Sequence, residues 1–143
     1  AVTMMTRVAH ANEIPEDVSD LPEVPTDDSI SRSVYKTAIN VRAKYIIALT
    51  ETGKSARLVA RFDPNVPILA LTPVKETIQS LTLTANIMPF EIPSLKTFDA
   101  VLEFIPQFLQ KEKLAKKGDK VVVTAGVPFA AAGSTNMILV VTV

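Results

Sequence analysis

The stretch Tyr45-Ile-Ile-Ala-Leu-Thr-Glu-Thr-Gly-Lys-Ser55 decides the fold of this chain. An apolar run over residues 45–49 ends in a short loop of hydroxyl-bearing residues and a glycine, and an apolar pattern of helical spacing over 56–62 follows at once. This order predicts a strand, a loop and the start of a helix. Backbone N–H groups, hydroxyls and the positive end of the helix dipole would converge in the loop. The stretch is therefore predicted to bind an anion such as phosphate.

Length and composition predict one domain with a substantial core. The chain has 143 residues, of which 48% are hydrophobic, which is too apolar for a disordered segment. It has no cysteine, which excludes a disulfide scaffold and a thiolate metal site and agrees with a cytoplasmic location. The uncharged segment 121–143 is long enough to span a membrane, but glycine, proline and polar residues interrupt its middle. We therefore expect two buried strands there and no membrane partner.

The chain divides into three predicted regions. Residues 1–12 carry apolar side chains on one helical face. Residues 13–28 hold seven acidic residues, three prolines and no basic residue, which is the composition of a linker. Residues 29–143 would form the globular domain, with 14 Lys and Arg against 8 Asp and Glu, an excess of 6 positive charges. Such a charge balance favours anionic ligands.

Helical and strand patterns alternate along the globular region. Asp27 or Asp28 is expected to cap its first helix, and Pro106 is expected to kink or split its last one. Because alternating elements form right-handed crossovers, the pattern predicts a three-layer α/β/α sandwich with a mixed, mostly parallel, five-stranded sheet. No helical pattern joins the last two strands, so this pair is expected to be antiparallel. The predicted helices are 30–41, 56–61, 72–83 and one that begins at residue 94, and the predicted strands are 45–49, 67–71, 86–90, 121–124 and 137–143.

The anion loop has two other interpretations. Residues 48–55 fit the loose form of the Walker A pattern, but no neighbouring strand is predicted to end in the Asp that holds Mg²⁺ in P-loop enzymes. A plain turn, capped by Thr52 with Gly53 at its bend, would also explain these residues. His10 is the only histidine and has no nucleophile nearby, so neither a catalytic residue nor a metal site is predicted. The lysines between residues 111 and 117 lack interleaved aromatic residues, and no nucleic-acid partner is expected.

Several motifs of the chain resemble the C-terminal domain of pyruvate kinase. They keep that family's order and spacing over nearly all 143 residues. The residues 1–9 are similar to the last helix of the family's catalytic barrel. The other matching motifs are Leu49-Thr-Glu-Thr-Gly-Lys-Ser-Ala56, Val59-Ala-Arg61, Pro67-Ile-Leu-Ala-Leu-Thr72, Lys117-Gly-Asp119, Val121-Val-Val-Thr-Ala-Gly126 and Gly133-Ser-Thr-Asn136.

The resemblance implies a regulatory role for a chain without its own reaction centre. Pyruvate kinase transfers phosphate from phosphoenolpyruvate to ADP in its barrel with Mg²⁺ and K⁺, so residues 1–12 would be a barrel remnant. The chain alone would be inactive and without a cofactor, and its start at Ala1 without an initiator Met agrees with a fragment. In the family this domain carries an allosteric effector site and a subunit interface. The implied partners are a phosphorylated small-molecule effector, the catalytic barrel and sister subunits.

The resemblance also implies which residues bind the effector. Glu51 stands where members activated by fructose bisphosphate often have Lys, and residues 127–136 contain no Lys or Arg, so a bisphosphate is expected to bind poorly. A stand-alone P-loop-like nucleotide-binding enzyme, and an assembly module with a vestigial anion site, stay open as alternatives. The implied phosphate-binding residues are Thr50, Glu51, Thr52, Gly53, Lys54 and Ser55, and the loop that would close over the effector contains Gly126, Val127, Pro128, Gly133, Ser134 and Thr135.

Overall fold

The computed structural model describes residues 21–62, 64–129 and 133–143. The predicted first helix, residues 1–12, and His10 lie outside these ranges. Helices and strands alternate as the sequence predicts, up to the final pair of strands. The elements are α2 (Thr26–Asn40), β1 (Tyr45–Leu49), α3 (Lys54–Ala60), β2 (Ile68–Thr72), α4 (Lys75–Leu81), β3 (Ile87–Glu91), α5 (Phe98–Lys111), β4 (Lys120–Ala125) and β5 (Met137–Thr142).

The five strands form one mixed sheet in the order β3-β2-β1-β4-β5. The pairs β3-β2, β2-β1 and β1-β4 are parallel, and the pair β4-β5 is antiparallel. The chain adds β2 and β3 on one side of β1 and then crosses to add β4 on the other side. The neighbours β1 and β4 therefore mark a topological switch point, where loops that leave the carboxyl ends of the strands diverge and form a crevice.

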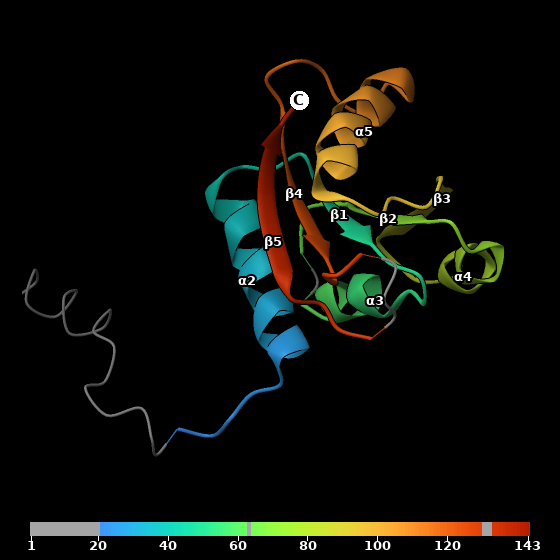
Figure 1. Ribbon diagram of the computed structural model, residues 1–143. Helices are drawn as coiled ribbons and strands as arrows, with labels where there is room; N and C mark the ends of the chain where they lie inside the picture. Colours follow the sequence, from blue (N-terminus) through green and yellow to red (C-terminus); the bar gives the residue numbers. More distant parts are fainter. Residues whose placement is uncertain (1–20, 63, 130–132) are drawn as a thin grey trace, which may run out of the picture.

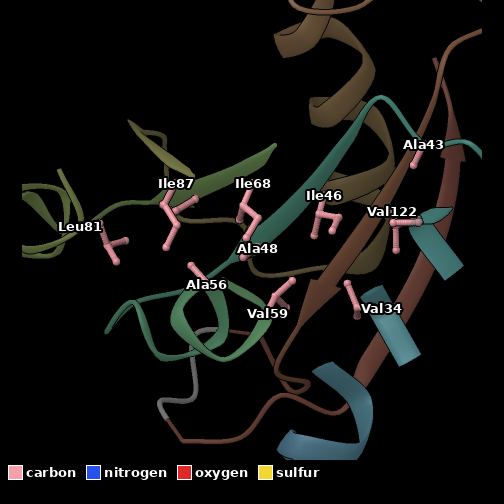
Figure 2. Close-up of a cluster of buried hydrophobic side chains, with 12 residues drawn as sticks. Val34, Ala43, Ile46, Ala48, Ala56, Val59, Ile68, Leu81, Ile87 and Val122 are labelled. Atoms are coloured by element: carbon pink, nitrogen blue, oxygen red, sulfur yellow. The ribbon is translucent and has the colours of Figure 1, made fainter. Parts of the chain in front are cut away.

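Helices cover both faces of the sheet, which confirms the predicted three layers. Figure 1 shows α2, α3 and α4 on one face and α5 on the other. Figure 2 shows Val34 of α2, Val59 of α3 and Leu81 of α4 among the strand side chains that they cover; all three are fully buried. Removing such aliphatic side chains from water stabilises the fold by about 1.5–3 kcal/mol each. The buried strand residues of this face are Ile46, Ala48, Ile68, Ala70, Ile87 and Val122.

Among the described helices, α5 is the one that covers the opposite face. This helix buries Val101, Ile105 and Leu109 completely, and these residues recur at four-residue intervals along one side of it. Phe108 of α5 contacts Phe90 of β3 edge to face, with ring centroids 5.4 Å apart. Pro106 lies inside the continuous helix, so of the two predicted outcomes, a kink or a split, the split is wrong. The buried stripe on either side of Pro106 holds the helix together despite the missing backbone donor.

The cap expected for α2, and the cap that the plain-turn interpretation gives to α3, both differ from the structure. Helix α2 follows Pro25, and Asp27 and Asp28 lie inside its first turn, without a side-chain cap. This helix also begins within residues 13–28, which were predicted to be linker. Helix α3 follows Gly53, not Thr52, because Gly53 adopts a φ of +83° that turns the chain sharply into the helix.

The starts of α4 and α5 also lie later than the sequence pattern predicts. Thr72 is the last residue of β2, and its hydroxyl accepts a hydrogen bond from the Val74 N–H at 3.1 Å, so α4 begins only at Lys75. Thr97 caps α5 through a hydrogen bond from the Ala100 N–H at 3.1 Å. Among the described residues, no helix is both long and apolar enough to cross a membrane.

Candidate functional site

The loop after β1 is held in a tight conformation by its own first residue. The Thr50 N–H donates to the Leu71 carbonyl of β2 at 3.1 Å, and the Thr50 hydroxyl accepts from the Gly53 N–H at 2.8 Å. In this conformation the Gly53 amide is therefore engaged within the loop. The Thr52 hydroxyl lies at the surface, 3.4 Å from the Lys54 N–H, which is a long contact.

Helix α4 anchors the same loop from the side. Its Thr77 hydroxyl donates to the Glu51 carbonyl, and Arg57 of α3 donates to the Thr52 carbonyl at 3.2 Å and to the Ser80 hydroxyl at 2.8 Å. Among the described residues, no acceptor contacts the N–H groups of Glu51 and Thr52. The contacts with Thr77 and Arg57 thus fix the loop through the carbonyls of Glu51 and Thr52, in addition to the bonds made by Thr50.

The side chain of Asn136 bridges the two ends of the loop after β4. This amide accepts from the Val127 N–H and donates to the Val127 carbonyl, both at 2.8 Å, and the Asn136 N–H donates to the Ala125 carbonyl at 3.1 Å. The Asn136 side chain thereby continues the β4-β5 pairing by one step. Residues 130–132 lie outside the described ranges. Gly126 is half-buried, and Val127, Pro128, Gly133 and Ser134 are exposed.

The two predicted loops meet through a pair of hydroxyls. Ser55, in the first turn of α3, forms a hydrogen bond with Thr135. Thr135 is the second-last residue of the loop that joins β4 to β5. Both residues are buried, with 8% and 1% of their surface exposed. The structure therefore brings one residue of each predicted group into contact, across 80 positions of sequence, at the switch point of the sheet.

A small cavity opens at the carboxyl edge of the sheet; Ser55 and Thr135 are not among the residues that line it. Its walls come from the ends of β1, β2, β3 and β4 and from the segment before α5, and most of them are apolar. Thr50 and Gly126 line it, and Glu51 is the only charged residue among the described residues of the wall. Phe129 and Ile92 add apolar surface that the sequence did not single out. The cavity has the mixed character of a small-molecule site, with an apolar wall and a few polar groups.

Lys54, the predicted cation of the anion loop, is paired with a carboxylate from another helix. Its Nζ lies 2.5 Å from Oδ2 of Asp27 in α2. The hydrogen bond from Lys54 holds the pKa of the Asp27 carboxyl below its usual value of 3.8, so Asp27 is charged at neutral pH. Sequence reasoning missed this contact because it assigned Asp27 to a helix cap.

Metal ligands do not gather in the described part of the chain. No group of three His, Asp or Glu side chains lies close enough there to hold one ion. The resemblance places Mg²⁺ in the catalytic barrel, and we assign the described residues no step of phosphoryl transfer.

Comparison with known protein families supplies a match over most of the chain. A family profile described as "Pyruvate kinase, alpha/beta domain" matches residues 28–141. The pyruvate kinase of Dictyostelium discoideum is 33% identical over 155 residues, which cover 100% of this chain and 31% of that protein. The pyruvate kinase of Eimeria tenella is 31% identical over 152 residues, with 100% and 29% covered. The chain thus spans less than a third of the length of these relatives.

Solved structures of the same kind share the fold. The crystal structure of a pyruvate kinase from Cryptosporidium parvum aligns with 98% of this chain and 26% of its own, at a TM-score of 0.73 and 24% identity. A second structure of the enzyme from that organism aligns with 98% of this chain and 25% of its own, at a TM-score of 0.71 and 23% identity. At these identities the likeness concerns the fold alone.

Proposed function

Because this chain belongs to the pyruvate kinase family, as its C-terminal alpha/beta domain, we propose that it is the allosteric and oligomerisation part of a phosphoryl-transfer enzyme of glycolysis. Its own task would be to bind a phosphorylated effector between the loops after β1 and β4. Transfer of phosphate from phosphoenolpyruvate to ADP, with Mg²⁺ and K⁺, would occur in a catalytic barrel. We expect the enzyme to work in the cytoplasm as a homo-oligomer.

The hydrogen bond between Ser55 and Thr135 is the observation that carries this proposal. It joins two loops that are distant in sequence, at the point of the fold where open α/β sheets bind ligands. Hydroxyl groups both donate and accept, so Ser55, Thr135 and the nearby Thr52 can turn toward a phosphate without a change of backbone. Charge-assisted hydrogen bonds to phosphate oxygens are about twice as strong as neutral ones, which favours this exchange of partners.

The charges of the two loops favour a ligand with one phosphate over a ligand with two. Glu51 lines the cavity, and residues 126–136 contain no Lys or Arg. Two like charges 4 Å apart repel by about 1 kcal/mol in water and about 4 kcal/mol at the effective dielectric constant of a protein surface. A second phosphate near Glu51 would therefore lose about a factor of five or more in affinity.

Calorimetry on the full chain tests the proposal with two probes, fructose 6-phosphate and fructose 1,6-bisphosphate. We expect the monophosphate to bind and the bisphosphate to bind more weakly. Lys54→Met should weaken binding of the monophosphate, because it removes the only cation of the loop. Lys75→Met is the matched control, since Lys75 is also an exposed lysine in the first turn of a helix but belongs to α4. Absence of binding, or equal losses in both variants, would contradict the proposed site.

A second candidate function is an assembly module whose anion loop is vestigial. It is favoured by the Gly53 amide and the Lys54 ammonium, which both have partners within the chain. In that case neither probe would bind, and Lys54→Met would leave self-association unchanged. A stand-alone P-loop enzyme is less consistent with the family match, and β1, β2 and β4 do not end in an Asp.

A further inference from the structure

An ion pair between two helices lies on the edge of the candidate site. Asp27 of α2 and Lys54 at the start of α3 form an ion pair, with 2.5 Å between Oδ2 and Nζ. The Asp27 side chain is only 17% exposed, whereas that of Lys54 is 54% exposed. The carboxylate is thus held against the protein, and the ammonium reaches toward it from the loop.

The Asp27 carboxylate is positioned by its own helix. Its Oδ1 accepts a hydrogen bond from the Asp28 N–H at 3.0 Å, and the Ser31 hydroxyl donates to the Asp27 carbonyl at 2.6 Å. Lys54, by contrast, has a flexible stem of four carbons and a side chain that is 54% exposed, so its ammonium can change partners. Of the two residues, Lys54 is therefore the one that can turn away.

We propose that Asp27 is an internal competitor for Lys54, so that an anion bound in the loop after β1 must draw Lys54 away from Asp27 and thereby loosen the N-terminus of α2. This inference rests on the proposed function and adds its regulation. Lys54 is the only cation among residues 50–55, so an anion in this loop and Asp27 compete for the same ammonium. The competition lowers the affinity of the loop for the anion.

A second ion pair would keep α2 attached to the protein when Lys54 turns away from Asp27. Nη1 of Arg61, directly after α3, lies 3.3 Å from Oδ1 of Asp28. Two ionic contacts therefore join the first turn of α2 to α3 and to the residue after it, and anion binding would remove only the contact that involves the loop. By linkage the coupling is reciprocal: any contact that holds the first turn of α2 against α3 weakens anion binding, and a bound anion weakens that contact.

The test compares Asp27→Asn with Asp28→Asn in the full chain, with fructose 6-phosphate as the probe in calorimetry. Both variants remove one carboxylate from the first turn of α2 and one ion pair to α3, but only Asp27 contacts the loop. Exposed ion pairs contribute little, so we expect Asp27→Asn to raise the affinity about two- to fivefold. Asp28→Asn should leave the affinity unchanged.

Hydrogen exchange supplies a second measurement. Saturating fructose 6-phosphate should speed amide exchange over residues 27–31 in the unmodified chain and have no such effect in Asp27→Asn. If Asp27→Asn loses α2 by circular dichroism, Asp27→Ser repeats the comparison with another small residue that suits a helix start. Equal affinity of the unmodified chain and the Asp27 variant would overturn this inference and leave the effector site standing. Failure of all three proteins to bind would overturn both.

Discussion

At the scale of single residues, Gly53 is the position of the site where the backbone restricts the side chain most. Its φ of +83° is strained for other residues, and an added Cβ would lie 2.9 Å from Nη1 of Arg57 and 3.1 Å from a methyl of Leu81. We predict that Gly53→Ala lowers the free energy of unfolding by about 1–2 kcal/mol from the backbone alone, and by more through the displaced neighbours. Urea unfolding measures this change.

A substitution at Gly118 distinguishes the cost of backbone strain from the cost of displacing neighbouring side chains. It also has a positive φ, +96°, but no atom lies within 4 Å of the position of an added Cβ. Gly118→Ala should therefore lower the free energy of unfolding through backbone strain alone. The decrease should be smaller than that caused by Gly53→Ala. Equal losses at the two positions would mean that Arg57 and Leu81 move aside freely.

The buried pair of Ser55 and Thr135 makes a second prediction at this scale. Ser55→Ala would leave the Thr135 hydroxyl buried without a partner, and we expect it to lower the free energy of unfolding by about 1–3 kcal/mol. Thr135→Val should have a similar effect for the converse reason. The double variant should lose less than the sum, because both polar groups are then absent. Additive losses in urea unfolding would contradict the pairing.

The sequence predicts which residues form the loop after β1, but not which residues they contact. The hydroxyls and the glycine of residues 50–55 are adjacent in the chain, so their pattern is readable directly. The partners of this loop come from three other segments: Thr77 bonds the Glu51 carbonyl, Asp27 pairs with Lys54, and Thr135 bonds the Ser55 hydroxyl. No local pattern specifies such partners, because tertiary packing brings them together.

At the scale of elements, an acidic residue joins the amino ends of β1 and β4. The Asp119 carboxylate accepts from the Lys116 N–H at 2.9 Å and from Nζ of Lys44 at 3.3 Å. These bonds, the first more than the second, hold the pKa of Asp119 below its usual 3.8. A pKa that is lower in the folded state stabilises the fold above the unfolded value, and this stabilisation is lost as pH falls through the folded pKa.

We therefore predict that the free energy of unfolding decreases as the pH falls below about 4, and that Asp119→Asn makes this decrease shallower. Lys44→Met should give an intermediate slope, since it removes only the weaker of the two causes. Asp27 contributes to the same decrease, so Asp119→Asn should not abolish it. Unfolding in urea across pH 2–6 measures the slopes, and identical slopes for Asp119→Asn and the unmodified chain would refute the assignment.

The strands were more predictable than the helix ends. Ile68–Thr72 is buried at every position, and a continuous apolar run carries that information in the sequence itself. Several polar residues near each helix start are able to cap it, and the sequence does not indicate which of them makes the capping bond. Asp27 could cap α2, but it pairs with Lys54; Ser94 could start α5, but Thr97 makes the capping bond.

At the scale of the whole molecule, strand order decides where the site lies. The alternation of elements predicts a parallel sheet with covered faces, but not that β4 lies beside β1. That adjacency places the loops after β1 and β4 at one end of the sheet (Figure 1). The predicted site residues come from motifs in the sequence, whereas the contact between Ser55 and Thr135 across the sheet depends on this strand order.

The other consequence of strand order is an open edge at β5. This strand is the last of the sheet, and its Val140 is 42% exposed, so an apolar strand with unpaired backbone groups borders solvent within the described chain. Pairing of two copies along β5 would cover it, and we predict that the chain reaches twice its mass of 15.5 kDa as its concentration rises. Val140→Lys should shift this association to higher concentration, because charge on an edge strand opposes pairing. Leu83→Lys is the control, since Leu83 is 94% exposed between α4 and β3. Light scattering that shows a monomer throughout, or equal effects of both variants, would place the interface elsewhere.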